Sequence, residues 1–202
     1  AAPPGRRHGL AERRRLVTTG SAAGSPAFSA LSQLYASTGG AGWTNRANWM
    51  ASGTGPCTGS WYGVTCSSSG EVTVLELGSN GLTGSLPSEV GSLTSLTKGG
   101  DTSTTNRLVS YNSLSSTLPT EFGRLTLLTD GFAFMESELS GTVPSEIGNL
   151  VKLTRGMWVH VNKLNGAIPT ELGRLTGLTT AGFDFSRNSL VGPVPTEIGR
   201  LT

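Results

Sequence analysis

One stretch of the sequence reads NKLNGAIPTELGRL (residues 162–175), and residues 80–93 repeat its plan as NGLTGSLPSEVGSL. The plan recurs when the chain is aligned on five prolines. Each is followed by Glu two positions later, Gly four later and Leu six later, and each is preceded by Leu five positions earlier. The aligned residues are Pro87, Pro119, Pro144, Pro169 and Pro195. Agreement at this many positions predicts a repeat architecture.

A second column of the alignment lies seven positions before each proline. It contains Asn80, Asn112, Asn162 and Asn188, and Ser137 breaks the series. An Asn amide both donates and accepts hydrogen bonds, so it can satisfy backbone groups where the chain turns out of a strand. We therefore expect these side chains to form a structural ladder.

Each repeat also carries its own secondary-structure pattern. Apolar pairs with period two come before the Asn position and predict a short strand with one buried face: Leu75/Leu77, Phe132/Phe134, Met157/Val159 and Phe183/Phe185. After each proline we expect Ser or Thr to cap a short helical turn, with Glu at its positive end. Because one unit cannot bury its apolar side alone, the units are predicted to stack as a right-handed α/β solenoid.

Residues 27–70 precede the repeats and have a different composition. Four residues at helical spacing predict a helix that ends at Thr38-Gly39-Gly40: Phe28, Leu31, Leu34 and Tyr35. Trp43, Trp49 and Trp61 follow, and we expect them to cover the apolar end of the repeats.

The chain has two cysteines, Cys57 and Cys66, with eight residues between them. This spacing lacks the paired C-x2-C pattern of zinc sites, and no His is nearby. A close pair in a segment rich in Gly, Ser and Trp favours one disulfide in an oxidising compartment. Two reduced thiols in a cytosolic protein are the alternative.

These motifs resemble the plant-type leucine-rich repeat, L-x-x-L-x-L-x-x-N-x-L-x-G-x-I-P. The segment from Pro56 through Trp61 to Cys66, with the helix before it, is similar to the N-terminal cap of that family. The resemblance covers about residues 27–202. It implies a leucine-rich-repeat solenoid with a disulfide-tied cap (27–70) and about five repeats (71–202), the last incomplete. It also implies a curved parallel sheet whose concave face binds proteins or peptides.

The repeats depart from that pattern in their length. The aligned prolines are separated by 32, 25, 25 and 26 residues, where the family prefers 24. The largest excess lies at Lys98–Asn106; we expect an evolved surface loop there or residues translated from an intron. Arg107 then occupies an inward position, which predicts a register slip. Gly131, Gly156 and Gly182 are expected just before their strands, where a bulge forms easily.

Residues 1–26 form a basic leader of low complexity that we expect to be disordered. Its first twenty residues hold five Arg and one Glu, a net charge of +4, whereas the rest of the chain has a net charge of −2. Because the body has no basic excess and no aromatic residue precedes Phe28, a nucleic-acid partner is not predicted. No apolar run reaches the length of a membrane span, so any such span would belong to a longer parent protein.

Catalytic and cofactor-binding motifs do not occur in the sequence. His8 lies in the leader, and His160 has no nucleophile placed near it by any motif. There is no H-E-x-x-H, no P-loop and no dinucleotide fingerprint. The five repeated Glu residues are one structural position copied along the chain. The sequence therefore predicts a protein that is not an enzyme and has no cofactor or metal.

The remaining candidate site is the outward face of the predicted strands. We expect ligand contacts from Tyr111, Met135, Glu136, Trp158, His160, Asp184 and Arg187, and Glu76 is a further outward residue. Alternation puts Trp158 and His160 on one face, and Met135 and Asp184 should follow on adjacent strands about 4.8 Å away. An aromatic side chain beside Met, His and a carboxylate favours a binding hot spot.

We expect a non-catalytic recognition module that binds a protein, peptide or glycan outside the cell or at its surface. A cell-wall or matrix spacer that binds nothing is the structural alternative. Because the chain stops inside a repeat without a closing cap, we expect a fragment of a longer protein. The resemblance implies that this parent is a receptor-like kinase or a secreted protein of the inhibitor type. If the Arg-rich leader is a transit sequence, the location becomes a plastid or the cytoplasm.

Overall fold

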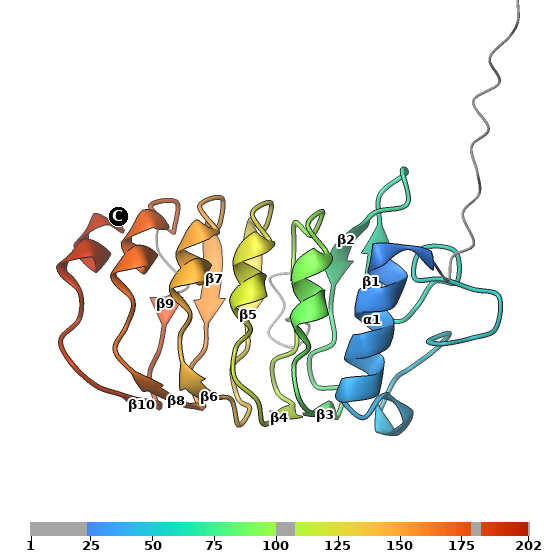
Figure 1. Cartoon of the computed structure of the whole chain (residues 1–202), viewed down its shortest axis with the longest axis horizontal. Helices are drawn as coiled ribbons and strands as arrows, with labels where there is room; N and C mark the ends of the chain where they lie inside the picture. The colour runs from blue at the N-terminus through green and yellow to red at the C-terminus, as the bar shows by residue number, and fades with distance from the viewer. Residues whose placement is uncertain (1–23, 100–107, 179–182, 202) are drawn as a thin grey trace, which may run out of the picture.

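A computed structural model describes residues 24–99, 108–178 and 183–201. Repeated units lie side by side in a row, and the cap packs at one end (Figure 1). Each unit contributes backbone to two sheets and adds one short 3-10 helix. This arrangement is the predicted leucine-rich-repeat solenoid with parallel strands and a disulfide-tied cap.

The cap begins with helix α1, Pro26–Ser37. Its N-cap is Ser25, whose Oγ accepts a hydrogen bond from the Phe28 N–H at 3.1 Å, so these first residues belong to the cap and not to the leader. The helix ends at Thr38, and Gly39 adopts a left-handed φ of 68° before the 3-10 helix η2, Gly40–Gly42. Proline at the first helical position and glycine past the last are the expected boundaries of such a helix.

The three cap tryptophans form one buried cluster. The ring centroids of Trp43 and Trp49 are 4.8 Å apart, as are those of Trp49 and Trp61. The indole N–H groups of Trp43 and Trp49 donate to the carbonyl oxygens of Thr38 and Tyr62. The cluster is continuous with the leucine core of the repeats, and burial of this apolar surface stabilises the end of the solenoid.

The first sheet combines cap and repeats. Strand β1 (Val64–Cys66) pairs antiparallel with β2 (Val72–Leu75). Strands β5 (Asp130–Ala133), β7 (Arg155–Trp158) and β9 (Phe183–Asp184) are parallel neighbours. Lys98 joins the two groups, because it forms isolated bridges with Val74 and Asp130.

The second sheet lies along another edge of the solenoid (Figure 1, lower edge). Strands β3 (Thr83–Gly84) and β4 (Ser113–Leu114) form one parallel pair. Strands β6 (Ser140–Thr142), β8 (Lys163–Gly166) and β10 (Ser189–Leu190) form a parallel group of three. A bridge between Thr117 and Ser140 connects the pair to the group.

The predicted helical turns are 3-10 helices, and their predicted caps are wrong. They are η3 (Ser88–Ser92), η4 (Thr120–Arg124), η5 (Ser145–Asn149), η6 (Thr170–Arg174) and η7 (Thr196–Arg200). In each one the N-cap is the proline, and no side chain caps the helix. The following Ser or Thr is already the first helical residue, and its hydroxyl donates to the next Glu, as Ser145 Oγ does to Glu146 Oε2 at 3.3 Å.

The glycine at the fourth position after each proline permits close stacking of these turns. A Cβ atom added at Gly148 would collide with the carbonyl oxygen and Cβ of Glu171 in the next repeat. Gly91, Gly123 and Gly173 meet the following repeat in the same way, whereas Gly199 has nothing within 4 Å. The repeated glycine therefore reflects contact between repeats.

The largest insertion interrupts the second repeat between Gly99 and Leu108. The Leu108 N–H donates to the Gly99 carbonyl, and Gly99 N–H donates to Asp130 O at 3.0 Å. The two flanks are thus bonded to each other and to β5. Arg107, Gly182 and residues 1–23 lie outside the described residues. Gly131 and Gly156 lie inside β5 and β7, not before them, with left-handed φ values of 82° and 78°.

Candidate functional site

Trp158 is the one tryptophan of the chain that is not buried. It lies on β7, and its six-membered ring covers Gly156, two residues earlier on the same strand: an added Cβ there would lie 2.7 Å from Trp158 Cη2. Any other residue at position 156 would displace the ring. Glycine at position 156 therefore leaves the space that the Trp158 ring occupies along the sheet surface.

His160 and Asp184 lie beside Trp158. The register of β7 and β9 places Asp184 opposite Trp158, and His160 Nδ1 is 3.2 Å from Asp184 Oδ2. This distance permits an ion pair when the imidazole is protonated. The angles at these two atoms do not make a hydrogen bond, and Nδ1 is buried with no hydrogen-bond partner in the part of the chain that the structure describes. The pair therefore retains hydrogen-bonding capacity at the sheet surface.

Asp184 is held in its ionised form. Partial burial opposes ionisation, but hydrogen bonds from the backbone and side chain of Ser186 and the charges of His160 and Arg187 together outweigh it. The Ser186 N–H donates to Asp184 Oδ1 at 2.9 Å. The pKa of Asp184 consequently lies below its ordinary value. This corner of the sheet presents a fixed carboxylate, an imidazole and an indole.

The expectation that Met135 is accessible is wrong. Met135 is 1% exposed, and its neighbours Ala133, Leu108 and Ser110 are equally buried. Alternation along a strand decides which way a side chain points, but it does not decide what lies above that side chain. The accessible part of this face is therefore displaced towards β7 and β9, and Met135 is not retained as a ligand contact.

Tyr111, Glu136 and Arg187 are not on strands. Each precedes the Asn-ladder position and has a left-handed φ, of 56°, 51° and 52° respectively. Backbone hydrogen bonds join this position to the neighbouring repeats: Tyr111 N–H donates to Met135 O, Glu136 N–H donates to His160 O, and Arg187 O accepts from Asn162 N–H. They are exposed. A left-handed backbone at a position occupied by residues other than glycine cannot be predicted from the alternation of apolar and polar residues.

The Asn amides bond one repeat to the next. Asn162 Nδ2 donates to Phe134 O at 2.8 Å and Val159 O at 3.0 Å, while its Oδ1 accepts from Leu139 N–H at 2.9 Å. Asn112 and Asn188 make corresponding bonds. At the exception, Ser137 Oγ makes a single bond to Asn112 O at 3.3 Å. The column is structural, as the amide chemistry requires.

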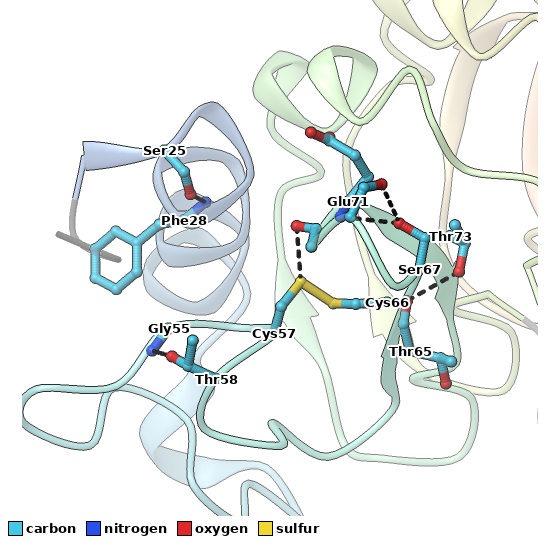
Figure 2. The surroundings of a disulfide bond; sticks show 12 residues. Ser25, Phe28, Gly55, Cys57, Thr58, Thr65, Cys66, Ser67, Glu71 and Thr73 are labelled. Atoms are coloured by element: carbon cyan, nitrogen blue, oxygen red, sulfur yellow. Dashed lines mark hydrogen bonds between the residues drawn. A yellow bond between two sulfur atoms is a disulfide. The ribbon is translucent and has the colours of Figure 1, made fainter. Parts of the chain in front are cut away.

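The disulfide joins Cys57 to Cys66, as predicted, with Cα atoms 5.6 Å apart. Figure 2 shows it between the loop below α1 and the end of β1. Hydrogen bonds hold both flanks: Gly55 N–H donates to Thr58 Oγ1 and Glu71 N–H donates to Ser67 Oγ. The cross-link therefore fixes the cap loop next to the first parallel repeat.

A second surface was missed by the sequence reasoning. On and beside the second sheet, three successive repeats present two columns of hydroxyl side chains: Thr83, Ser115 and Ser140 in one, and Ser85, Thr117 and Thr142 in the other. Within the described residues, none of these six hydroxyls bonds to another protein group. The triplets Thr83-Gly84-Ser85 and Ser140-Gly141-Thr142 were a visible signal.

A third column, made only of threonines, behaves in the opposite way. Thr97, Thr129 and Thr154 donate their hydroxyls to the carbonyl oxygens of Thr73, Thr97 and Thr129 at 3.2, 3.0 and 3.1 Å. Each hydroxyl therefore joins a repeat to its predecessor and is not available to a ligand. The same residue type thus forms a structural ladder beside one sheet and a free hydroxyl surface on the other.

Two further properties bear on what these surfaces can do. No group of three or more His, Cys, Asp or Glu in the described part of the chain could hold a metal ion. Across that same part, no helix has the length and apolar character needed to cross a membrane.

Comparison with protein families gives two adjoining matches. Residues 28–67 match the leucine rich repeat N-terminal domain, and residues 71–93 match the leucine rich repeat. A comparison with curated protein sequences gives no significant match.

Solved structures share the fold over most of the chain. A chain of the BIR3–SERK2 complex from Arabidopsis thaliana is 25% identical with a TM-score of 0.68, and the match covers 85% of this chain and 86% of that one. A plant ice-binding protein is 27% identical with a TM-score of 0.66 over 87% of this chain and 52% of that one.

The plant peptide hormone receptor RGFR1, in complex with RGF2, is 29% identical with a TM-score of 0.53 over 64% of this chain. Here the chain spans only 19% of the length of its relative. Cap, disulfide, repeat pattern and these matches agree: the chain is a plant-type leucine-rich-repeat protein with an N-terminal cysteine-containing cap.

Proposed function

We propose that the chain is a non-catalytic, extracellular recognition module that binds a peptide or protein on the face formed by β7 and β9. The observation that carries the proposal is the fixed group of Trp158, His160 and Asp184, in which an oriented indole lies beside a carboxylate and an imidazole. Aromatic side chains held in place beside polar groups are typical centres of binding energy. A glycan ligand would use the same indole surface.

The likeness to plant receptor structures supports this assignment. The RGFR1 structure is a receptor in complex with RGF2, and the match to it covers 64% of this chain. The parent protein would be a receptor-like kinase that uses this part as its sensing ectodomain, or a secreted protein. Both parents place the module outside the cell, where the Cys57–Cys66 disulfide is stable.

The test uses a random-peptide display library selected on the immobilised protein. Enriched peptides should bind the Trp158→Ala variant at least about tenfold more weakly, because a hot-spot truncation removes a large share of the binding energy. Thr126→Ala changes an exposed residue away from the site and should leave affinity unchanged. A library that yields no binder, or binders insensitive to Trp158→Ala, would contradict the proposal and favour the spacer.

A second candidate function is ice binding. It is favoured by the likeness to a plant ice-binding protein together with the six hydroxyls on and beside the second sheet, which have no bond to another group among the described residues. The test is direct: the protein is offered to a slowly growing ice surface, and the fraction taken into the ice is compared with that of serum albumin. Uptake equal to that of albumin would exclude this function.

A further inference from the structure

We propose that the ice-contacting surface is the hydroxyl array defined by Thr83, Ser115, Ser140, Ser85, Thr117 and Thr142. The inference rests on the second candidate function and assigns it to one face of the molecule. Its ligand is a lattice of ordered water, and the surface of the first sheet takes no part.

The array is held in a fixed geometry by the repeats themselves. A Cβ added at Gly141 would lie 2.9 Å from Thr117 Cγ2, and one added at Gly166 would lie 2.8 Å from Thr142 Cγ2. Each threonine methyl therefore packs over the glycine of the next repeat. With its methyl packed there, the side chain is confined to one rotamer, and the hydroxyl points in a defined direction. Threonine provides this restraint because both its branches leave Cβ.

The array also has a two-dimensional spacing. Parallel strands repeat about every 4.8 Å across the sheet, and alternate residues are separated by roughly 6–7 Å along a strand. The register offsets the two columns between neighbouring repeats, since Thr117 of one column bridges Ser140 of the other and Ser140 pairs with Lys163 on β8. Hydroxyls at such regular intervals can each hydrogen-bond one water of an ordered layer without competition from the protein.

The chemistry of the array favours water over other ligands. Its six side chains carry no charge and no aromatic ring, so they offer neither ion pairs nor a stacking surface for a sugar. A charged pair lies beside it, where Lys163 Nζ pairs with Glu138 Oε2 at 2.9 Å. Its three threonines add methyl groups beside the hydroxyls, so the face offers water both hydrogen-bonding groups and apolar surface.

The array ends within the described chain. In the next repeat the equivalent residues are Asn165 and Ala167, and in the last they are Val191 and Pro193. Ala167 Cβ lies 3.8 Å from a Cβ added at Gly192, so a threonine methyl at position 167 would find the same glycine beneath it. The repeat therefore accepts an extension of the array.

The test compares two double variants that carry the same chemical change. Thr117→Lys with Thr142→Lys places two charges in the array, while Thr126→Lys with Thr176→Lys places two charges on exposed threonines that follow η4 and η6. Uptake into growing ice should fall at least tenfold in the first and remain at the wild-type level in the second. Unfolding midpoints should match in both, which separates a surface effect from misfolding.

Two further measurements separate failure of the surface assignment from failure of the ice-binding function. Asn165→Thr with Ala167→Thr should increase ice uptake severalfold. Wild-type protein that enters ice while the Thr117→Lys and Thr142→Lys protein enters equally well would overturn the assignment but keep the function. Wild-type protein that stays out of ice would overturn both, as would binding to crystalline cellulose in place of ice.

Discussion

Two threonine columns in this molecule differ in what their hydroxyls touch. Thr97, Thr129 and Thr154 each donate to the preceding repeat, whereas the hydroxyls of Thr117 and Thr142 are unbonded within the described protein. In a solenoid a residue repeated at fixed spacing either joins neighbouring repeats or faces outward. The repetition of a threonine therefore does not show whether it has a structural or a binding role. Whether its hydroxyl is hydrogen-bonded to the protein distinguishes the two roles.

The largest expected effect comes from a column that joins repeats. Gly148→Ala should lower the free energy of unfolding by about 3 kcal/mol, because its Cβ would collide with the backbone of Glu171 and force the turns apart. Urea unfolding measures the change. Gly199→Ala is the matched control, since a Cβ added at the same position in the last described repeat has nothing within 4 Å. Equal losses of unfolding free energy in both variants would show that the glycine is not needed for close stacking of the repeats.

The Asn ladder should give the next effect. Asn162→Ala removes donors to Phe134 O and Val159 O and the acceptor of Leu139 N–H, and it should cost about 2 kcal/mol because buried backbone groups lose their partners. Thermal unfolding provides the measurement. Ser137→Ala, at the exceptional position with one long bond, should cost much less; a similar cost would show that the amide bonds contribute little.

The threonine columns themselves give a smaller and sharper contrast. Thr154→Val keeps the shape of the side chain but removes its bond to Thr129 O, and it should destabilise the protein by about 1 kcal/mol. Thr142→Val removes a hydroxyl that has no partner among the described residues, so the unfolding free energy of the variant should equal that of the wild type. Reversed results would contradict the division between the columns.

The smallest effect concerns the pH dependence of Asp184. Because its folded-state pKa is lowered from 3.8, the carboxylate contributes stability above that pH and loses it as pH falls through the folded-state value. Asp184→Asn should therefore be less stable by about 0.3 kcal/mol near neutral pH, since the side chain is partly in water. The two proteins should converge in acid; a difference that grows below pH 3.8 would contradict the assignment.

The repeat columns made much of this fold predictable. Leucine and phenylalanine at period two located the buried strand positions, and the cysteine spacing located the disulfide. Period two was misleading at Met135, because it gives the direction of a side chain but not whether other residues cover it. The predicted caps after each proline were wrong because the proline itself is the N-cap residue. The hydroxyl array could be identified only from the structure, which shows which threonine hydroxyls are hydrogen-bonded and which are not.

The role of Trp158 as the centre of a recognition surface can be measured by oxidative footprinting of side chains with and without a peptide selected on the protein. We predict protection of Trp158 on binding and no change at Met50, an exposed cap residue that serves as internal control. Oxidation of Trp158 that is unaffected by a saturating concentration of peptide would contradict the account.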